Sequence, residues 1–140
     1  MALALNRDEV AEYLDDIFPQ VRGDFRIDAL AEMSVTMRLL AHDRHLRPGG
    51  TVSGPAMFAL ADVTAYVLVL SMVGRKALAV TTNCAIDFLR KPVSGADVIA
   101  EGRLLKLGRQ LAVSDVLLRS EGTDAVVARA SLTYALPPDR

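Results

Sequence analysis

The stretch that decides the fold, residues 49–74, reads GGTVSGP and then AMFALADVTAYVLVLSMVG. The two opening glycines are a turn signal, Ser53 or Gly54 can cap a helix, and Pro55 suits the first helical turn, where its missing N–H costs nothing. The residues that follow are almost all apolar, and the closing glycine is a typical helix stop. The sequence therefore predicts a helix over about 54–73 that is hydrophobic on every side. Such a helix is either a membrane span or the core of a domain.

Asp62 is the exception inside this apolar run, and no cation lies at the neighbouring helix positions. A carboxylate in such surroundings must find a partner elsewhere in the chain, stay protonated or take part in chemistry. The run is long enough to span a bilayer, which takes about 20 residues, but an ionised acid at its centre would cost several kcal/mol. Because the rest of the chain reads as amphipathic strands that need something to cover, we predict the core helix of a soluble domain.

The flanking sequence predicts one short helix and a series of strands. Asn6 and Glu9 have the spacing of a capping box, and apolar residues at helical spacing predict a helix over about 6–18. Short turns join the last four predicted strands, which favours an antiparallel meander. Strand-like patterns occur at residues 23–31, 32–41, 77–90, 96–107, 109–120 and 125–136. In the third of these, alternation predicts one shared face for Val80, Thr82, Cys84, Ile86 and Phe88.

Length and composition predict one α+β domain over residues 1–140. The chain is 51% hydrophobic, with a mean hydropathy of +0.28, and surplus apolar surface in so small a domain usually belongs to a subunit interface. The net charge of −1 gives no support to binding of nucleic acid or an anionic membrane. The single cysteine, Cys84, suits a reducing compartment, and we see no secretory signal, so we expect a cytoplasmic protein.

The order of elements and three motifs resemble a known family. A helix, two strands, a long central helix and four further strands are the order of the hotdog fold, a curved antiparallel sheet wrapped around a long hydrophobic helix. The segment from Gly50 to Asp62 is similar to the signature of hotdog acyl-CoA thioesterases of the phenylacetate-degradation type. The segment IDFLRKP, from Ile86 to Pro92, and the Gly108-Arg109 turn are similar as well. The likeness runs from about residue 25 to about residue 135.

The resemblance implies an active site and an activity, the hydrolysis of an acyl-CoA thioester. Asp62 corresponds to the catalytic carboxylate, the Gly54 N–H to the group that polarises the thioester carbonyl, and Thr81 to a hydroxyl residue that helps to hold the attacking water. Residues that would bind substrate are Thr82, beside Thr81, then Phe58, which could line the acyl pocket, and Arg47, Ser53 and Pro55. At Arg47 and Ser53 the family usually has an Asn and a His, whose side chains line its active site, and at Pro55 it usually has a Gly.

The chemistry of the residues agrees with this reading and adds a constraint. Thioester hydrolysis needs a base or nucleophile at the carbonyl carbon and a donor to the developing oxyanion, which Asp62 and the free N–H at Gly54 can supply. The two residues are eight positions apart, or roughly 12 Å along a helix. Residues of one chain therefore cannot serve the same carbonyl. We predict a homodimer whose site takes Asp62 from one protomer and Gly54 from the other, and this dimer could pair further into a homotetramer.

Coenzyme A enters as part of the substrate, so the sequence predicts no separate cofactor. Its phosphates would meet cations at strand ends, from the set Arg90, Lys91, Lys106 and Arg109. His42 and His45 have no companions at metal-ligand spacing, so we predict no metal site. A non-catalytic acyl-CoA-binding hotdog protein is the alternative. A hotdog dehydratase is less favoured, because no His lies on the central helix.

Overall fold

The long apolar helix α2 spans Gly54–Val73, the range that the sequence predicts. Ser53 is its N-cap and accepts the N–H of Ala56 on its side-chain oxygen at 3.2 Å. Gly74 ends the helix with a φ of 96°, a backbone conformation that favours glycine. Of the helices in residues 2–138, α2 alone is long and apolar enough to span a membrane, but 78% of its most apolar window is buried within the fold.

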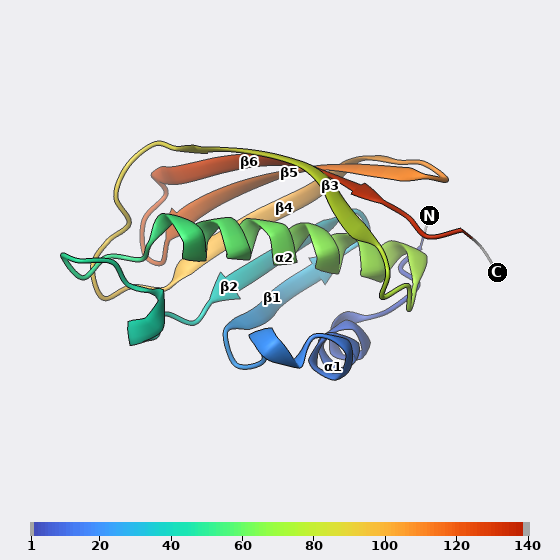
Figure 1. Cartoon of the computed structure of the whole chain (residues 1–140), viewed down its shortest axis with the longest axis horizontal. Helices are drawn as coiled ribbons and strands as arrows, with labels where there is room; N and C mark the ends of the chain where they lie inside the picture. Colours follow the sequence, from blue (N-terminus) through green and yellow to red (C-terminus); the bar gives the residue numbers. More distant parts are fainter. Residues whose placement is uncertain (1, 139–140) are drawn as a thin grey trace.

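The computed structural model describes residues 2–138, in which a single antiparallel sheet wraps α2 in the arrangement of the hotdog fold (Figure 1). The order of strands across the sheet is β1-β2-β4-β5-β6-β3. The strands are β1 (Phe25–Ala31), β2 (Ser34–Leu39), β3 (Val80–Phe88), β4 (Val98–Leu107), β5 (Leu111–Ser120) and β6 (Val126–Ala135). Two short 3-10 helices, η1 (Pro19–Val21) and η2 (Asp43–His45), lie in the connections.

Helix α1 (Arg7–Ile17) begins with the capping box that the sequence predicts. The Asn6 side chain accepts the Glu9 N–H at 2.9 Å, and the Glu9 carboxylate accepts the Asn6 N–H at 3.0 Å. Val10 and Leu14 are the buried residues of α1, which packs against β1 and α2. This helix therefore covers one end of the core with a single apolar stripe.

The predicted four-stranded meander is wrong in one respect, because β3 pairs with β6 and not with β4. The residues between β3 and β4 do not form a hairpin turn but cross to the opposite side of α2, where β4 pairs with β2 (Figure 1). In this topology β1 and β2 close over one side of the helix and β3 closes over the other. A helix that is apolar on every side is covered better in this way than by strands that all continue in one direction.

The predicted common face of β3 is also wrong, because a β-bulge shifts its register between Thr81 and Asn83. The extra residue makes Thr81, rather than Thr82, share the partly buried face with Cys84 and Ile86. Val80, expected on the same face, is 57% exposed. Simple alternation cannot predict such an insertion, since it assumes two residues per repeat along the whole strand.

Helix α2 packs closely against the sheet at Gly102 of β4. A Cβ added at Gly102 would lie 2.6 Å from Cγ2 of Thr64 and 3.1 Å from Cδ1 of Leu68. Thr64 is fully buried, and its hydroxyl donates to the Leu60 carbonyl at 2.6 Å, which holds the side chain in place. The space above Gly102 is therefore filled by a side chain that cannot move aside cheaply.

Gly102→Ala is expected to lower the free energy of unfolding by about 1–3 kcal/mol, because overpacking forces neighbours off their rotamers. Urea unfolding of the single variant and of Gly102→Ala/Thr64→Ser measures this effect. Serine lacks the Cγ2 that the new methyl would meet, so the double variant should be more stable than the sum of the two single changes predicts. Strict additivity would contradict the clash.

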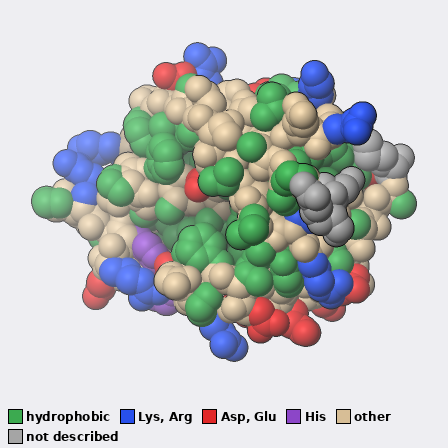
Figure 2. Space-filling model, turned by 45° about the vertical axis from the view of Figure 1, so that its right-hand side comes forward, with side chains coloured by type: hydrophobic (Ala, Val, Ile, Leu, Met, Phe, Trp, Pro, Cys, Tyr) green, Lys and Arg blue, Asp and Glu red, His purple; other side chains and the backbone are tan. Residues whose placement is uncertain are grey.

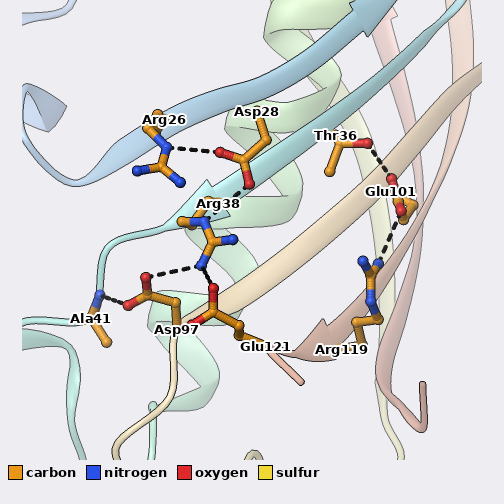
Figure 3. Close-up of polar contacts among 9 residues, drawn as sticks. All are labelled: Arg26, Asp28, Thr36, Arg38, Ala41, Asp97, Glu101, Arg119 and Glu121. Atoms are coloured by element: carbon orange, nitrogen blue, oxygen red, sulfur yellow. Dashed lines mark hydrogen bonds and ion pairs between the residues drawn. The ribbon is translucent and has the colours of Figure 1, made fainter. Parts of the chain in front are cut away.

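On the side of the sheet away from α2, a network of charges ties β2 to the ends of β4 and β5 (Figure 3). Arg38, whose side chain is 12% exposed, pairs with Asp28 at 3.0 Å, with Asp97 at 3.2 Å and with Glu121. Burial alone would raise the pKa of Asp28, but hydrogen bonds from Arg26 and Arg38 outweigh it and hold this pKa below its ordinary value.

The same network fixes the start of the loop that leads into α2. The Asp97 carboxylate that pairs with Arg38 also accepts the Ala41 N–H at 2.9 Å (Figure 3). Farther along this loop, the Arg47 N–H donates to the Thr51 carbonyl at 2.9 Å. Hydrogen bonds thus hold the loop backbone at Ala41, where the loop starts, and at Arg47, just before the first turn of α2.

Candidate active site

One face of α2 stays partly open beside the edge strand β3. Gly54, Phe58 and Asp62 follow one another at intervals of four residues, so they lie on this face one turn apart. Phe58 is 40% exposed, whereas most other side chains of the helix are buried. Phe88, at the end of β3, is 50% exposed beside the start of the helix. On the side of the molecule where α2 lies in front, Figure 2 shows hydrophobic side chains across the middle and charged side chains mainly around the rim.

The Asp62 carboxylate finds its partners on two strands of the sheet. The Thr81 hydroxyl of β3 donates to its Oδ1 at 2.5 Å. The Tyr134 hydroxyl of β6 lies 2.8 Å from the same Oδ1 and 3.0 Å from the carbonyl oxygen of Asp62. None of the ion pairs within residues 2–138 includes Asp62, so hydroxyl groups rather than a strand arginine satisfy this acid.

Tyr134 is buried and remains a hydrogen-bond donor. Burial first, and then the charge of Asp62, raise the pKa of the Tyr134 hydroxyl far above its ordinary value. Its ring stacks on that of Tyr66, with 5.9 Å between the ring centroids. Burial and the nearby Asp62 also raise the pKa of the Cys84 thiol. This thiol therefore stays protonated beside the site, which does not suit a nucleophile.

Alkaline pH is expected to destabilise the fold through Tyr134. In the unfolded chain the phenol loses its proton near pH 10, whereas the raised pKa keeps it protonated in the native protein. Unfolding then releases a proton, so the free energy of unfolding falls by about 1.4 kcal/mol per pH unit above about pH 10. Urea unfolding between about pH 9 and about pH 11 measures this slope. The slope should be smaller in Tyr134→Phe, and an equal slope in the two proteins would contradict the prediction.

The first turn of α2 presents the second element of the predicted site. Gly54 is the first helical residue, and its N–H makes no hydrogen bond to the described part of the chain. A Cβ at this position would lie 3.5 Å from the ring of Phe88. Pro55, with Gly54, Phe58 and Phe88, lines a small apolar hollow at the surface. Ser53 is occupied as the helix cap.

The structure brings together three of the predicted basic residues and separates the others from them. Arg47, Arg90 and Lys91 line one surface hollow of about 340 Å³ together with Gly54. The Arg90 Nε also donates to the Val126 carbonyl at 3.0 Å. Arg109 lies instead with Lys106 at the β4–β5 turn, at the end of the sheet opposite to the start of α2 (Figure 1).

Thr82 was predicted beside Thr81 in the site, and the structure points it elsewhere. It is exposed, and its hydroxyl donates to the Thr133 carbonyl at 3.2 Å. Among the described residues, no group of three His, Cys, Asp or Glu side chains could hold a metal ion.

Sequence reasoning missed Tyr134. The available signal was a tyrosine on the apolar face of the last predicted strand. Its hydroxyl needs a polar partner in the core, and Asp62 is the one acid of the core helix. The significance of this signal depends on the pairing of β3 with β6, which sets Thr81 directly opposite Tyr134. Because the predicted meander placed β3 next to β4, no sequence pattern connected Tyr134 with Asp62.

The fold and this site define a hotdog protein that carries a hydroxyl-bound carboxylate on its central helix. The family model of the thioesterase superfamily matches residues 49–134. The chain belongs to this superfamily.

Similar proteins of known structure are of the same kind. A candidate thioesterase from Silicibacter sp. TM1040 is 60% identical, with 99% of this chain and 96% of that chain covered and a TM-score of 0.93. The phenylacetic acid degradation protein PaaI from Thermus thermophilus, solved as a mutant, is 26% identical over 84% of this chain and 97% of that chain, with a TM-score of 0.71. A hypothetical thioesterase from Streptococcus pneumoniae, solved with coenzyme A, shares the fold at 18% identity, with 91% and 98% of the two chains covered and a TM-score of 0.76.

Proposed function

We propose that the protein hydrolyses acyl-CoA thioesters to a free acid and coenzyme A. The observation that carries the proposal is the Asp62 carboxylate, bound by two hydroxyls on the open face of a helix whose first N–H, at Gly54, has no partner within residues 2–138. These are a base or nucleophile and an oxyanion donor, the two groups that acyl transfer to water requires. Membership of the thioesterase superfamily supports the same reaction.

In the proposed reaction Asp62 takes a proton from water, and the water oxygen attacks the thioester carbonyl carbon. The negative charge that develops on the carbonyl oxygen is stabilised by the Gly54 N–H and by the positive end of the α2 dipole. Collapse of the tetrahedral intermediate breaks the C–S bond, and the departing thiolate takes up the proton from Asp62. Direct attack by the carboxylate, followed by hydrolysis of the resulting anhydride, uses the same two groups.

The proposal requires two copies of the chain. Gly54 and Asp62 lie on one continuous helix, roughly 12 Å apart, so one carbonyl can contact both only if they come from different protomers. Exposed apolar side chains lie at both ends of the edge strand β3, Val80 and Phe88, and on the open face of α2, Phe58. Apolar surface of this kind supports a homodimer that covers this edge, with two equivalent sites related by a two-fold axis.

The surroundings of Gly54 support an anionic substrate. Arg47, Arg90 and Lys91 share a hollow with Gly54, and cations there could bind coenzyme A phosphates while the thioester lies at the helix start. The solved complex of the Streptococcus pneumoniae neighbour with coenzyme A supports the same ligand class. The proposal includes a cytoplasmic location, because a single unpaired cysteine suits a reducing compartment.

Release of free thiol from short-chain, medium-chain, long-chain and aryl acyl-CoAs tests this function, with size-exclusion chromatography on the same samples. We expect turnover with at least one member of the panel by a protein that elutes as a dimer or larger assembly. Saturable acyl-CoA binding without thiol release would contradict hydrolysis and favour a binding protein. Full activity in a monomer would contradict the shared site.

A further inference from the structure

We propose that Tyr134 is a positioning residue for Asp62: together with Thr81 it holds the carboxylate by Oδ1 and leaves Oδ2 as the oxygen that meets the attacking water. This inference rests on the proposed hydrolysis and assigns a function to a residue of the last strand. It also gives the Thr81 hydroxyl a different first partner, since this hydroxyl donates to the Asp62 carboxylate rather than to the attacking water.

The first argument is the convergence of two donors on one atom. Thr81 and Tyr134 both reach Oδ1, at 2.5 Å and 2.8 Å. No donor within residues 2–138 makes a hydrogen bond to Oδ2. A carboxylate oxygen without a protein donor keeps its lone pairs for a proton from water, while the occupied oxygen is a poorer base.

The second argument is that Tyr134 fixes the rotamer of Asp62. Its hydroxyl oxygen lies 2.8 Å from the side-chain Oδ1 and 3.0 Å from the carbonyl oxygen of the same residue. A single group that touches both the side chain and the backbone of Asp62 restricts the torsions that connect them. A catalytic group held in this way loses less freedom when the substrate binds.

The third argument is that the sheet is built to bring the two hydroxyls together. Thr81 and Tyr134 are directly paired residues of β3 and β6, and the β-bulge follows Thr81 at once. In a regular strand without a bulge, Thr81 lies three residues before Cys84 and would point to the opposite face of β3 from Cys84 and Ile86. Bulges that change the direction of a side chain occur frequently beside active sites.

The fourth argument is that the Tyr134 ring is held. It stacks on the ring of Tyr66 of α2, which is itself buried. The titratable groups that interact with the Asp62 carboxylate are Tyr134 from β6 and Cys84 from β3. Both are neutral at physiological pH, so the hydroxyl donors are the groups that stabilise the charged carboxylate.

The test compares the pH dependence of kcat and kcat/KM in the wild type, Tyr134→Phe and Tyr66→Phe, with hexanoyl-CoA and phenylacetyl-CoA as the probes. Tyr134→Phe should lower kcat by about tenfold to a hundredfold with little change in KM, the effect typical of losing a group that orients a catalytic residue. It should also move the acidic limb of the kcat/KM profile to higher pH, because a lost donor disfavours the charged carboxylate. Tyr66→Phe keeps the ring that stacks on Tyr134 and removes only a hydroxyl that donates to the Ala77 carbonyl at 2.6 Å, so it should leave this limb in place.

A second pair of variants guards against misfolding of Tyr134→Phe. Thr81→Val removes the other donor to Oδ1 and should shift the acidic limb in the same direction, whereas Thr81→Ser keeps the hydroxyl and should restore it. If the wild type turns over and Tyr134→Phe does not move the acidic limb, the positioning role of Tyr134 is overturned while the proposed hydrolysis stands. Absence of turnover in the wild type would overturn the proposed function, and the assignment of Oδ2 with it.

Discussion

Asp62→Asn is expected to lower kcat for thioester hydrolysis by about a thousandfold, within the range of about 10²–10⁴ typical of general-base catalysis. An amide can neither take a proton from water at neutral pH nor attack the thioester carbonyl. The shape is almost unchanged, and an amide oxygen can still accept the hydroxyls of Thr81 and Tyr134 at the position of Oδ1. Release of thiol measures the loss, and circular dichroism with size-exclusion chromatography checks that the fold and the assembly persist.

Asp87→Asn is the matched control for this variant. Asp87 is an exposed acid of β3 that pairs with Arg129 on the surface at 2.9 Å. Removing its charge costs a surface ion pair, which contributes little, and leaves the Asp62 hydrogen bonds untouched. Activity that survives Asp62→Asn would remove this carboxylate from the mechanism, and an equal loss in Asp87→Asn would point to a general effect of charge.

Loss of the Gly54 N–H is expected to reduce kcat by about 10²–10³, the effect of removing one oxyanion donor. The variant Gly54→Pro/Pro55→Ala moves the proline back by one position and deletes this N–H. Proline suits the first helical position, and Ser53, with φ −75° and ψ 159°, has the extended backbone that proline requires of the residue before it. The reference is Pro55→Ala, which has the same residue at position 55 and keeps the N–H of residue 54.

Mixing this variant with Asp62→Asn tests the division of the site between protomers. In a mixed dimer, the intact Asp62 of one chain meets the intact Gly54 of the other, so one of the two sites is restored. Random reassociation makes about half of the dimers mixed, and about a quarter of the wild-type activity should return. Activity no greater than the average of the two inactive proteins would contradict a site formed across the interface.

The sequence was sufficient for α2 because its signals are local. The cap, the proline, the apolar run and the closing glycine all lie within 49–74, and Asp62 stands out there against its neighbours. The arrangement around the acid depends on distant pairing, which local patterns do not encode. The return of β3 to the edge beside β6, the bulge after Thr81 and the contact with Tyr134 are three examples.

The basic residues predicted to bind substrate show the same limit of local sequence patterns. Arg90 and Lys91 follow β3 and lie close to the start of α2, whereas Arg109 occupies a comparable place in the sequence, at a strand end beside a turn. Only the direction in which each strand crosses the sheet separates them. Hydroxyl and charge patterns indicate which residues can bind an anion, but topology decides which of them gather at one place.

The single continuous helix that carries Gly54, Phe58 and Asp62 also limits how this chain can change length over evolution. Inserting or deleting one residue between Pro55 and Asp62 would turn everything beyond that point by about 100° and shift it by about 1.5 Å. The acid would then no longer face the hydroxyls of Thr81 and Tyr134. Length changes should therefore be tolerated in the surface turns near Gly95 and Gly122, which lie between strands and outside every helix and strand. In relatives that keep this chemistry, we expect the spacing from the helix start to the acid to stay constant while those turns vary.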